Sequence, residues 1–95
     1  MEPFELLTEF YETIADDARI GVTHISVYIA LVKEWNSNKG RSPVLINRKG
    51  IMKTAKISSR HTYNKCINDL HQFGYIKYIP TSNALDSSQV YLNLL

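Results

Sequence analysis

This 95-residue chain contains one cysteine, four glycines and three prolines. The single cysteine, Cys66, allows no internal disulfide and no cysteine-cluster metal site. So little glycine and proline excludes a collagen-like or low-complexity chain. The longest apolar run, residues 27–32, covers six residues, whereas a membrane-spanning helix needs about 20. With 44% hydrophobic and 21% charged residues, the sequence predicts one globular domain over residues 1–95.

Acidic residues are missing from one long stretch of the chain. Residues 39–65 contain eight Lys and Arg and no Asp or Glu, whereas residues 1–38 contain seven acidic and two basic residues. The net charge is only +2 because these regions largely cancel. A cation-rich stretch concentrates positive potential on one part of a small domain. A solvated basic surface is one interpretation, and contact with nucleic-acid phosphates is the other.

No set of residues in the sequence has the pattern of a catalytic or metal site. His24, His61 and His71 share no metal-ligand spacing, and Cys66 lies on an apolar stripe without a neighbouring base. There is no glycine-rich phosphate loop and no Ser/His/Asp set. We therefore expect no enzyme, no cofactor and no metal. The first ten residues carry acids where an export signal carries Lys or Arg, so we expect no export.

The first predicted helix covers residues 3–16, with Pro3 in its first turn and glutamates near its amino end. Its apolar residues recur at steps of three and four, as in an amphipathic helix, and we predict a stripe of Phe4, Leu7, Tyr11 and Ile14. This stripe is a candidate surface for a homodimer. The alternative is that it covers the core of its own chain.

A second helix is predicted from Thr23, as its N-cap, to about Ser37. Residues 43–46 form a short extended run. Asn47 is suited to cap a third helix near residues 48–55. The side chains predicted to point inward from these two helices are Tyr28, Leu31, Val32, Trp35, Ile51, Met52 and Ala55.

A fourth helix is predicted from Ser59 to Phe73, with Ser58 as its N-cap and Gly74 as its stop. Two runs rich in β-formers, residues 75–79 and 89–93, predict a hairpin with a long tip. The apolar stripe of the fourth helix consists of Tyr63, Cys66, Ile67, Leu70 and Phe73.

The segment ISSRHTYNKCINDLHQFGYIKY, residues 57–78, resembles the recognition-helix segment of winged helix-turn-helix DNA-binding domains. Examples are MarR-type and GntR-type regulators and the winged-helix domains of phage and plasmid replication initiators. The resemblance covers about residues 43–94. It departs from the regulator pattern in the predicted wing tip, residues 81–86, which contains no Arg or Lys. The residues that carry it are Ser59-Arg60-His61-Thr62, Tyr63, Asn64-Lys65, Cys66-Ile67, Leu70 and Gly74-Tyr75-Ile76.

The resemblance implies an α+β fold that is mainly α. Residues 21–95 would form a three-helix core plus a β-hairpin wing, and residues 1–20 an additional amphipathic extension. It also implies sequence-specific binding of double-stranded DNA by a small transcriptional regulator or accessory factor of a mobile element, phage or plasmid. Such a protein is expected to be cytoplasmic and nucleoid-associated.

The expected DNA contacts follow from the two faces of the fourth helix. If its apolar stripe packs on the core, the opposite side of its first two turns can enter a major groove. We expect base contacts from Ser59, Arg60, His61 and Asn64. We expect phosphate contacts from Arg48, Lys49, Lys53, Lys56 and Lys65.

Two other functions remain open at this point. The chain could be a winged-helix protein-interaction module in a replication or partition assembly, with the acidic first helix as its docking element. It could also be a small enzyme or a single-strand binder. The tyrosines that would stack bases in a single-strand binder are expected to pack in the domain instead, namely Tyr63, Tyr75, Tyr78 and Tyr91.

Overall fold

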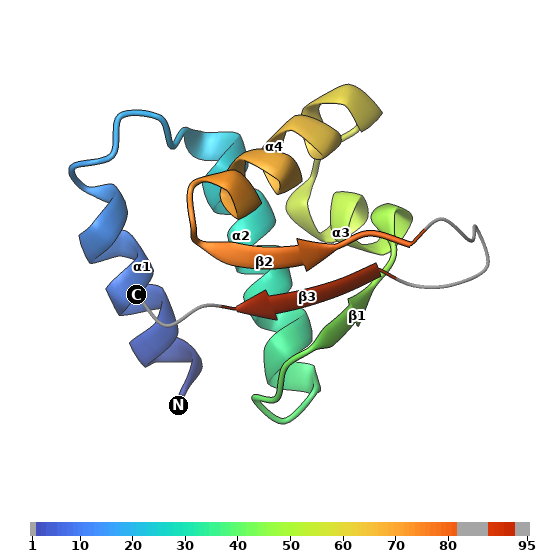
Figure 1. The fold of residues 1–95 in the computed structure, drawn as a ribbon, viewed down its shortest axis with the longest axis horizontal. Helices are drawn as coiled ribbons and strands as arrows, with labels where there is room; N and C mark the ends of the chain where they lie inside the picture. Colours follow the sequence, from blue (N-terminus) through green and yellow to red (C-terminus); the bar gives the residue numbers. More distant parts are fainter. Residues whose placement is uncertain (1, 82–87, 93–95) are drawn as a thin grey trace.

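The computed structural model describes residues 2–81 and 88–92, which form four helices and three strands (Figure 1). The expected α+β class, mainly helical, is confirmed. Helix α2 runs through the middle of the molecule and contacts the other three helices and the sheet. In chain order the elements are α1 (Pro3–Ile14), α2 (Val22–Ser37), β1 (Val44–Ile46), α3 (Arg48–Ala55), α4 (Arg60–Gln72), β2 (Ile76–Ile79) and β3 (Ser88–Leu92).

Helix α1 packs on α2 through a different stripe from the predicted one. It buries Leu6 and Phe10, one turn apart. The Phe10 ring stacks on Tyr28 of α2, with 3.8 Å between centroids and 3° between planes, and it makes a T-shaped contact with Tyr75. This three-ring contact selects the buried face of the helix. In the predicted stripe, Phe4 and Tyr11 are exposed. Leu7 and Ile14 are half-buried against the core.

The N-cap of α2 is Gly21, so the prediction of Thr23 was wrong. The cap is made by His24, whose Nδ1 accepts a hydrogen bond from the Gly21 N–H at 3.0 Å. A side chain three residues into a helix can reach back to the N-cap backbone in this way, a role that Glu or Gln usually fills. The predicted end at Ser37 is confirmed, as is the buried face of Tyr28, Leu31, Val32 and Trp35.

Helix α3 begins as predicted, because the Asn47 side chain accepts a hydrogen bond from the Gly50 N–H at 2.7 Å. For α4 the predicted cap, Ser58, was wrong by one residue. Ser59 is the cap, and its hydroxyl accepts from the Thr62 N–H at 3.1 Å. The predicted apolar stripe of α4 is confirmed: four side chains are buried and the last is half-buried, namely Tyr63, Cys66, Ile67, Leu70 and Phe73.

The three strands form one antiparallel sheet in the order β1-β3-β2. Val90 of β3 pairs with Val44 of β1 on one side and with Tyr78 of β2 on the other. The hairpin pairing of β2 with β3 was predicted, whereas the pairing of β1 with β3 was not. The predicted wing tip, residues 81–86, falls outside the described residues except for Thr81.

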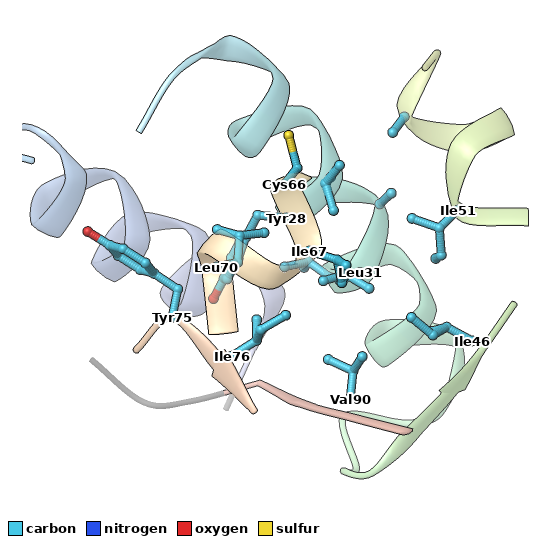
Figure 2. Packing of buried hydrophobic residues seen from close by; sticks show 14 of the residues in the cluster. Tyr28, Leu31, Ile46, Ile51, Cys66, Ile67, Leu70, Tyr75, Ile76 and Val90 are labelled. Atoms are coloured by element: carbon cyan, nitrogen blue, oxygen red, sulfur yellow. The ribbon is translucent and has the colours of Figure 1, made fainter. Parts of the chain in front are cut away.

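The core brings together side chains from all the elements (Figure 2). Leu31 of α2 lies at its centre, between residues of α4 and the sheet. Because both α3 and α4 pack on α2, their outward faces are held in a fixed relation to each other. The buried core residues labelled in Figure 2 are Tyr28, Leu31, Ile46, Ile51, Cys66, Ile67, Leu70, Tyr75, Ile76 and Val90.

Candidate nucleic-acid interface

Helix α4 turns one face to the core and another to solvent. On the solvent face, Arg60, His61 and Asn64 are exposed in the first two turns. The side chains of these three residues form no hydrogen bond or ion pair with any residue that the structure describes. They are therefore free to contact a ligand. Thr62 lies between the two faces and is half-buried.

Ser59 differs from the other three predicted base-contacting residues. Its hydroxyl oxygen accepts the hydrogen bond from Thr62 that caps α4, and the side chain is exposed. The hydroxyl proton stays available as a donor. Ser59 therefore orients the start of the helix and keeps its donor and one acceptor lone pair for an external group.

Helix α3 carries three cations and no acidic residue. Lys49 and Lys53 are exposed, and Lys56 follows at the C-cap with a positive φ of 62°. The Ser26 hydroxyl of α2 donates a hydrogen bond to the Ala55 carbonyl, which fixes the end of α3 against α2. The cations are thus presented from a helix that is anchored at its carboxyl end.

Arg48, the first residue of α3, is half-buried. Burial raises the pKa of Tyr63 to about 12, and the nearby charge of Arg48 opposes that rise. The Arg48 guanidinium therefore lies within electrostatic range of the first turns of α4. Tyr63 belongs to the buried stripe of α4, so Arg48 acts on the core side of that helix.

Lys65 is the one predicted phosphate-contacting residue with an acidic partner among the described residues. Its Nζ lies 2.8 Å from Oδ2 of Asp69, one turn further along α4. The same oxygen accepts from Nε2 of His24 at 2.8 Å. The Lys65 ammonium, and then His24, hold the pKa of Asp69 below its usual range. Lys65 is still largely exposed, but it would have to exchange this pairing for a phosphate.

The two cation-bearing helices are joined by a short turn, residues 56–59. In Figure 1, α3 and the amino end of α4 lie at the end of the molecule away from α1. Five of the predicted contact residues lie in α3, at its C-cap or at the start of α4. None of the five has an acidic partner among the described residues. They are Arg48, Lys49, Lys53, Lys56 and Arg60.

One exposed residue on the same face of α4 was not predicted. Asn68 lies one turn beyond Asn64 and donates a hydrogen bond from Nδ2 to the Asn64 carbonyl at 2.8 Å. The i, i+4 spacing of the two asparagines was the signal for it in the sequence. Asn68 extends the polar face into the third turn.

The four tyrosines considered as stacking platforms pack within the domain, as expected. Tyr63 and Tyr75 are buried, and Tyr78 and Tyr91 are half-buried. Among residues 2–81 and 88–92, no group of three or more His, Cys, Asp or Glu side chains is arranged to hold a metal ion. None of the described helices is both long and apolar enough to cross a membrane.

Neither protein-family models, nor curated proteins, nor solved structures gave a match to this chain.

Proposed function

We propose that this chain is a winged helix-turn-helix protein that binds double-stranded DNA sequence-specifically. The element order from α2 to β3, with β1 beside β3 in the sheet, supports this assignment. In such a domain α3 and α4 are the helix-turn-helix, α4 enters the major groove, and β2 and β3 form the wing. The observation that carries the proposal is the exposure of Arg60, His61 and Asn64 on α4, without a side-chain partner among the described residues, next to the acid-free helix α3.

Base recognition is assigned to the first two turns of α4. The major groove is about 12 Å wide and admits an α-helix, whose amino-terminal residues then meet the base edges. The Arg60 guanidinium has the geometry to donate two hydrogen bonds to guanine O6 and N7. The Asn64 amide can pair with adenine N6 and N7. His61 can donate to a base or to a phosphate.

Phosphate binding is assigned to the cations of α3 and its cap. Contacts from Lys49, Lys53 and Lys56 would fix the register of the protein without reading sequence. Arg48 would add a contact close to α4. Lys65 contributes less than these in our proposal, because Asp69 already neutralises it at 2.8 Å. The positive end of the α4 dipole adds to the attraction.

A protein of this kind would act as a small transcriptional regulator or as an accessory factor in replication or transfer of a mobile element, phage or plasmid. We infer this role from the winged-helix assignment alone. It implies a cytoplasmic, nucleoid-associated location.

Selection of bound sequences from a pool of randomised duplexes tests the proposal. We expect a defined site to be enriched, with affinity at least about a thousandfold above that for a scrambled duplex. If no sequence were enriched, the binding would be non-specific and the claim of sequence recognition would be wrong. Absence of any duplex binding at low salt would overturn it.

A second candidate is a protein-interaction module in a replication or partition assembly. The observation that favours it is the acidic helix α1, on which Phe4 is 78% exposed. Copurification of a stable partner that survives nuclease treatment would support this function. Retention of the purified chain on random duplex DNA would favour the first candidate instead.

A further inference from the structure

Helix α1 presents the exposed acid Glu5 next to an exposed aromatic side chain, whereas Oε2 of Glu9 is buried. Phe4, Glu5, Thr8 and Glu9 line a shallow hollow, and Phe4 is 78% exposed. No glutamate of α1 forms an ion pair with a residue that the structure describes. We call these four residues the α1 face. Its chemistry fits a cationic surface that also offers an apolar contact.

Strand β1 presents the opposite combination. Leu45 is 63% exposed between the buried Val44 and Ile46, and it lines two hollows beside the strand. The loop before the strand carries the exposed cations Lys39 and Arg41. We call Lys39, Arg41 and Leu45 the β1 face.

One carboxylate lies at the β1 face. Glu34 lines both hollows, but the Nζ of Lys33 lies 3.5 Å from its Oε1. Lys39 and Arg41 have no acidic partner among the described residues. The β1 face therefore keeps a net positive charge.

The two faces are held apart within one molecule, because α2 lies between α1 and β1 (Figure 1). They can meet only between two copies. A symmetric contact through α1 would bring the glutamates of both copies together, and a symmetric contact through β1 would bring the cations together. Like charges placed opposite each other disfavour both arrangements. A contact between unlike faces satisfies the charges on both.

We propose that copies of this chain associate head to tail, with the α1 face of one copy on the β1 face of the next. Phe4 packs beside Leu45, and Glu5 lies against Lys39 and Arg41. This inference does not rest on DNA binding, and it leaves residues 48–65 free. Because the two faces differ, the contact is heterologous, and assemblies grow with concentration unless they close into a ring.

Sedimentation velocity on the full chain tests the association. At about 0.1 M salt, where the Debye length is about 10 Å, the mean mass is expected to rise above 10.9 kDa with concentration. At about 1 M salt it should return to the monomer. A monomer at every concentration in low salt would overturn the proposal. A dimer that never grows and persists in high salt would also contradict it.

Charge reversal identifies the faces. Glu5→Lys and Lys39→Glu/Arg41→Glu should each remain monomeric alone, whereas their equimolar mixture should associate again. Lys77→Glu reverses an exposed cation on β2 and serves as the control, which has to associate like the original chain. Circular dichroism checks that each variant is folded. A reversed variant that associates unaided, or a mixture that stays monomeric, would overturn the assignment.

Discussion

Helices α1 and α4 both pack on α2, but their sequences determine the buried face to different degrees. In α4 the apolar residues form a single stripe, so the stripe fixes which side is buried. In α1, apolar residues occupy more positions than one face can bury, so two stripes fit the same spacing. The contact of Phe10 with Tyr28 and Tyr75 decides between them and leaves Phe4 in solvent. Helix α1 has more apolar residues than it can bury and therefore exposes Phe4, whereas the apolar stripe of α4 is buried or half-buried.

The largest effect expected from this comparison is on stability. Phe10→Ala should lower the free energy of unfolding by about 3–5 kcal/mol, because the buried ring is lost from its stack. Phe4→Ala should change it by less than about 0.5 kcal/mol, because that ring is mostly in solvent. Urea unfolding of both variants measures the difference. Equal losses would show that the predicted stripe through Phe4 contributes to the core after all.

The exposed face of α4 should matter for binding and not for folding. Arg60→Ala should cost about 1–3 kcal/mol on the selected duplex and little on a scrambled one, since a bidentate base contact is removed. Lys53→Ala should weaken binding to both duplexes alike. Fluorescence anisotropy on the two duplexes separates these outcomes. An Arg60 variant that keeps its full preference would exclude base recognition by this side chain.

Asp69 joins α4 to α2 through His24, and its effect should depend on pH. Since Nδ1 of His24 accepts from Gly21, Nε2 carries the proton that is donated to Asp69. Asp69→Asn should lower the free energy of unfolding by about 1–2 kcal/mol at neutral pH. The control, Asp16→Asn, removes an exposed carboxylate that has no partner among the described residues.

The pH dependence follows from the lowered pKa of Asp69. The ionised carboxylate stabilises the fold above the unfolded-state pKa of about 3.9, and this stabilisation is lost as the pH falls through the lower folded-state value. The difference between the original chain and Asp69→Asn should thus shrink as the pH falls below about 4. Urea unfolding between pH 7 and pH 2 measures this, and a difference that does not change with pH would contradict the account.

The smallest effect concerns the start of α4. Ser59→Ala should cost about 1 kcal/mol because the Thr62 N–H loses its acceptor. Ser58 is the residue before the cap, and Ser58→Ala should change the free energy of unfolding by less than about 0.5 kcal/mol. Thermal unfolding of the pair measures this. A larger loss from Ser58→Ala would restore the original prediction of the cap.

The sequence predicted, approximately, each helix and strand found in residues 2–81 and 88–92, because these segments carry their own spacing and end signals. Asn47 and Gly74 were sufficient signals because a cap and a left-handed stop act locally. Two caps were missed for a physical reason. Adjacent polar residues such as Ser58 and Ser59 offer equivalent caps, and the His24 cap of α2 also depends on Asp69, 45 residues away.

Long-range contacts were the least predictable part. Three residues of β1 cannot indicate that they pair with β3 instead of β2, because register depends on the assembled core. The exposure of Arg60, His61 and Asn64 on α4 was predictable from the spacing of its apolar stripe. The pairing of Lys65 with Asp69 was accessible from its i, i+4 spacing, whereas the third partner, His24, was not.

The salt dependence of duplex binding tests the central claim most directly. If Arg48, Lys49, Lys53 and Lys56 each neutralise one phosphate, log K should fall with log salt concentration at a slope of about −3 to −4. The measurement is a series of anisotropy titrations of a duplex between about 0.05 and 0.2 M salt. A slope in that range is the predicted result. A slope near zero, or no binding at the lowest salt, would contradict the account.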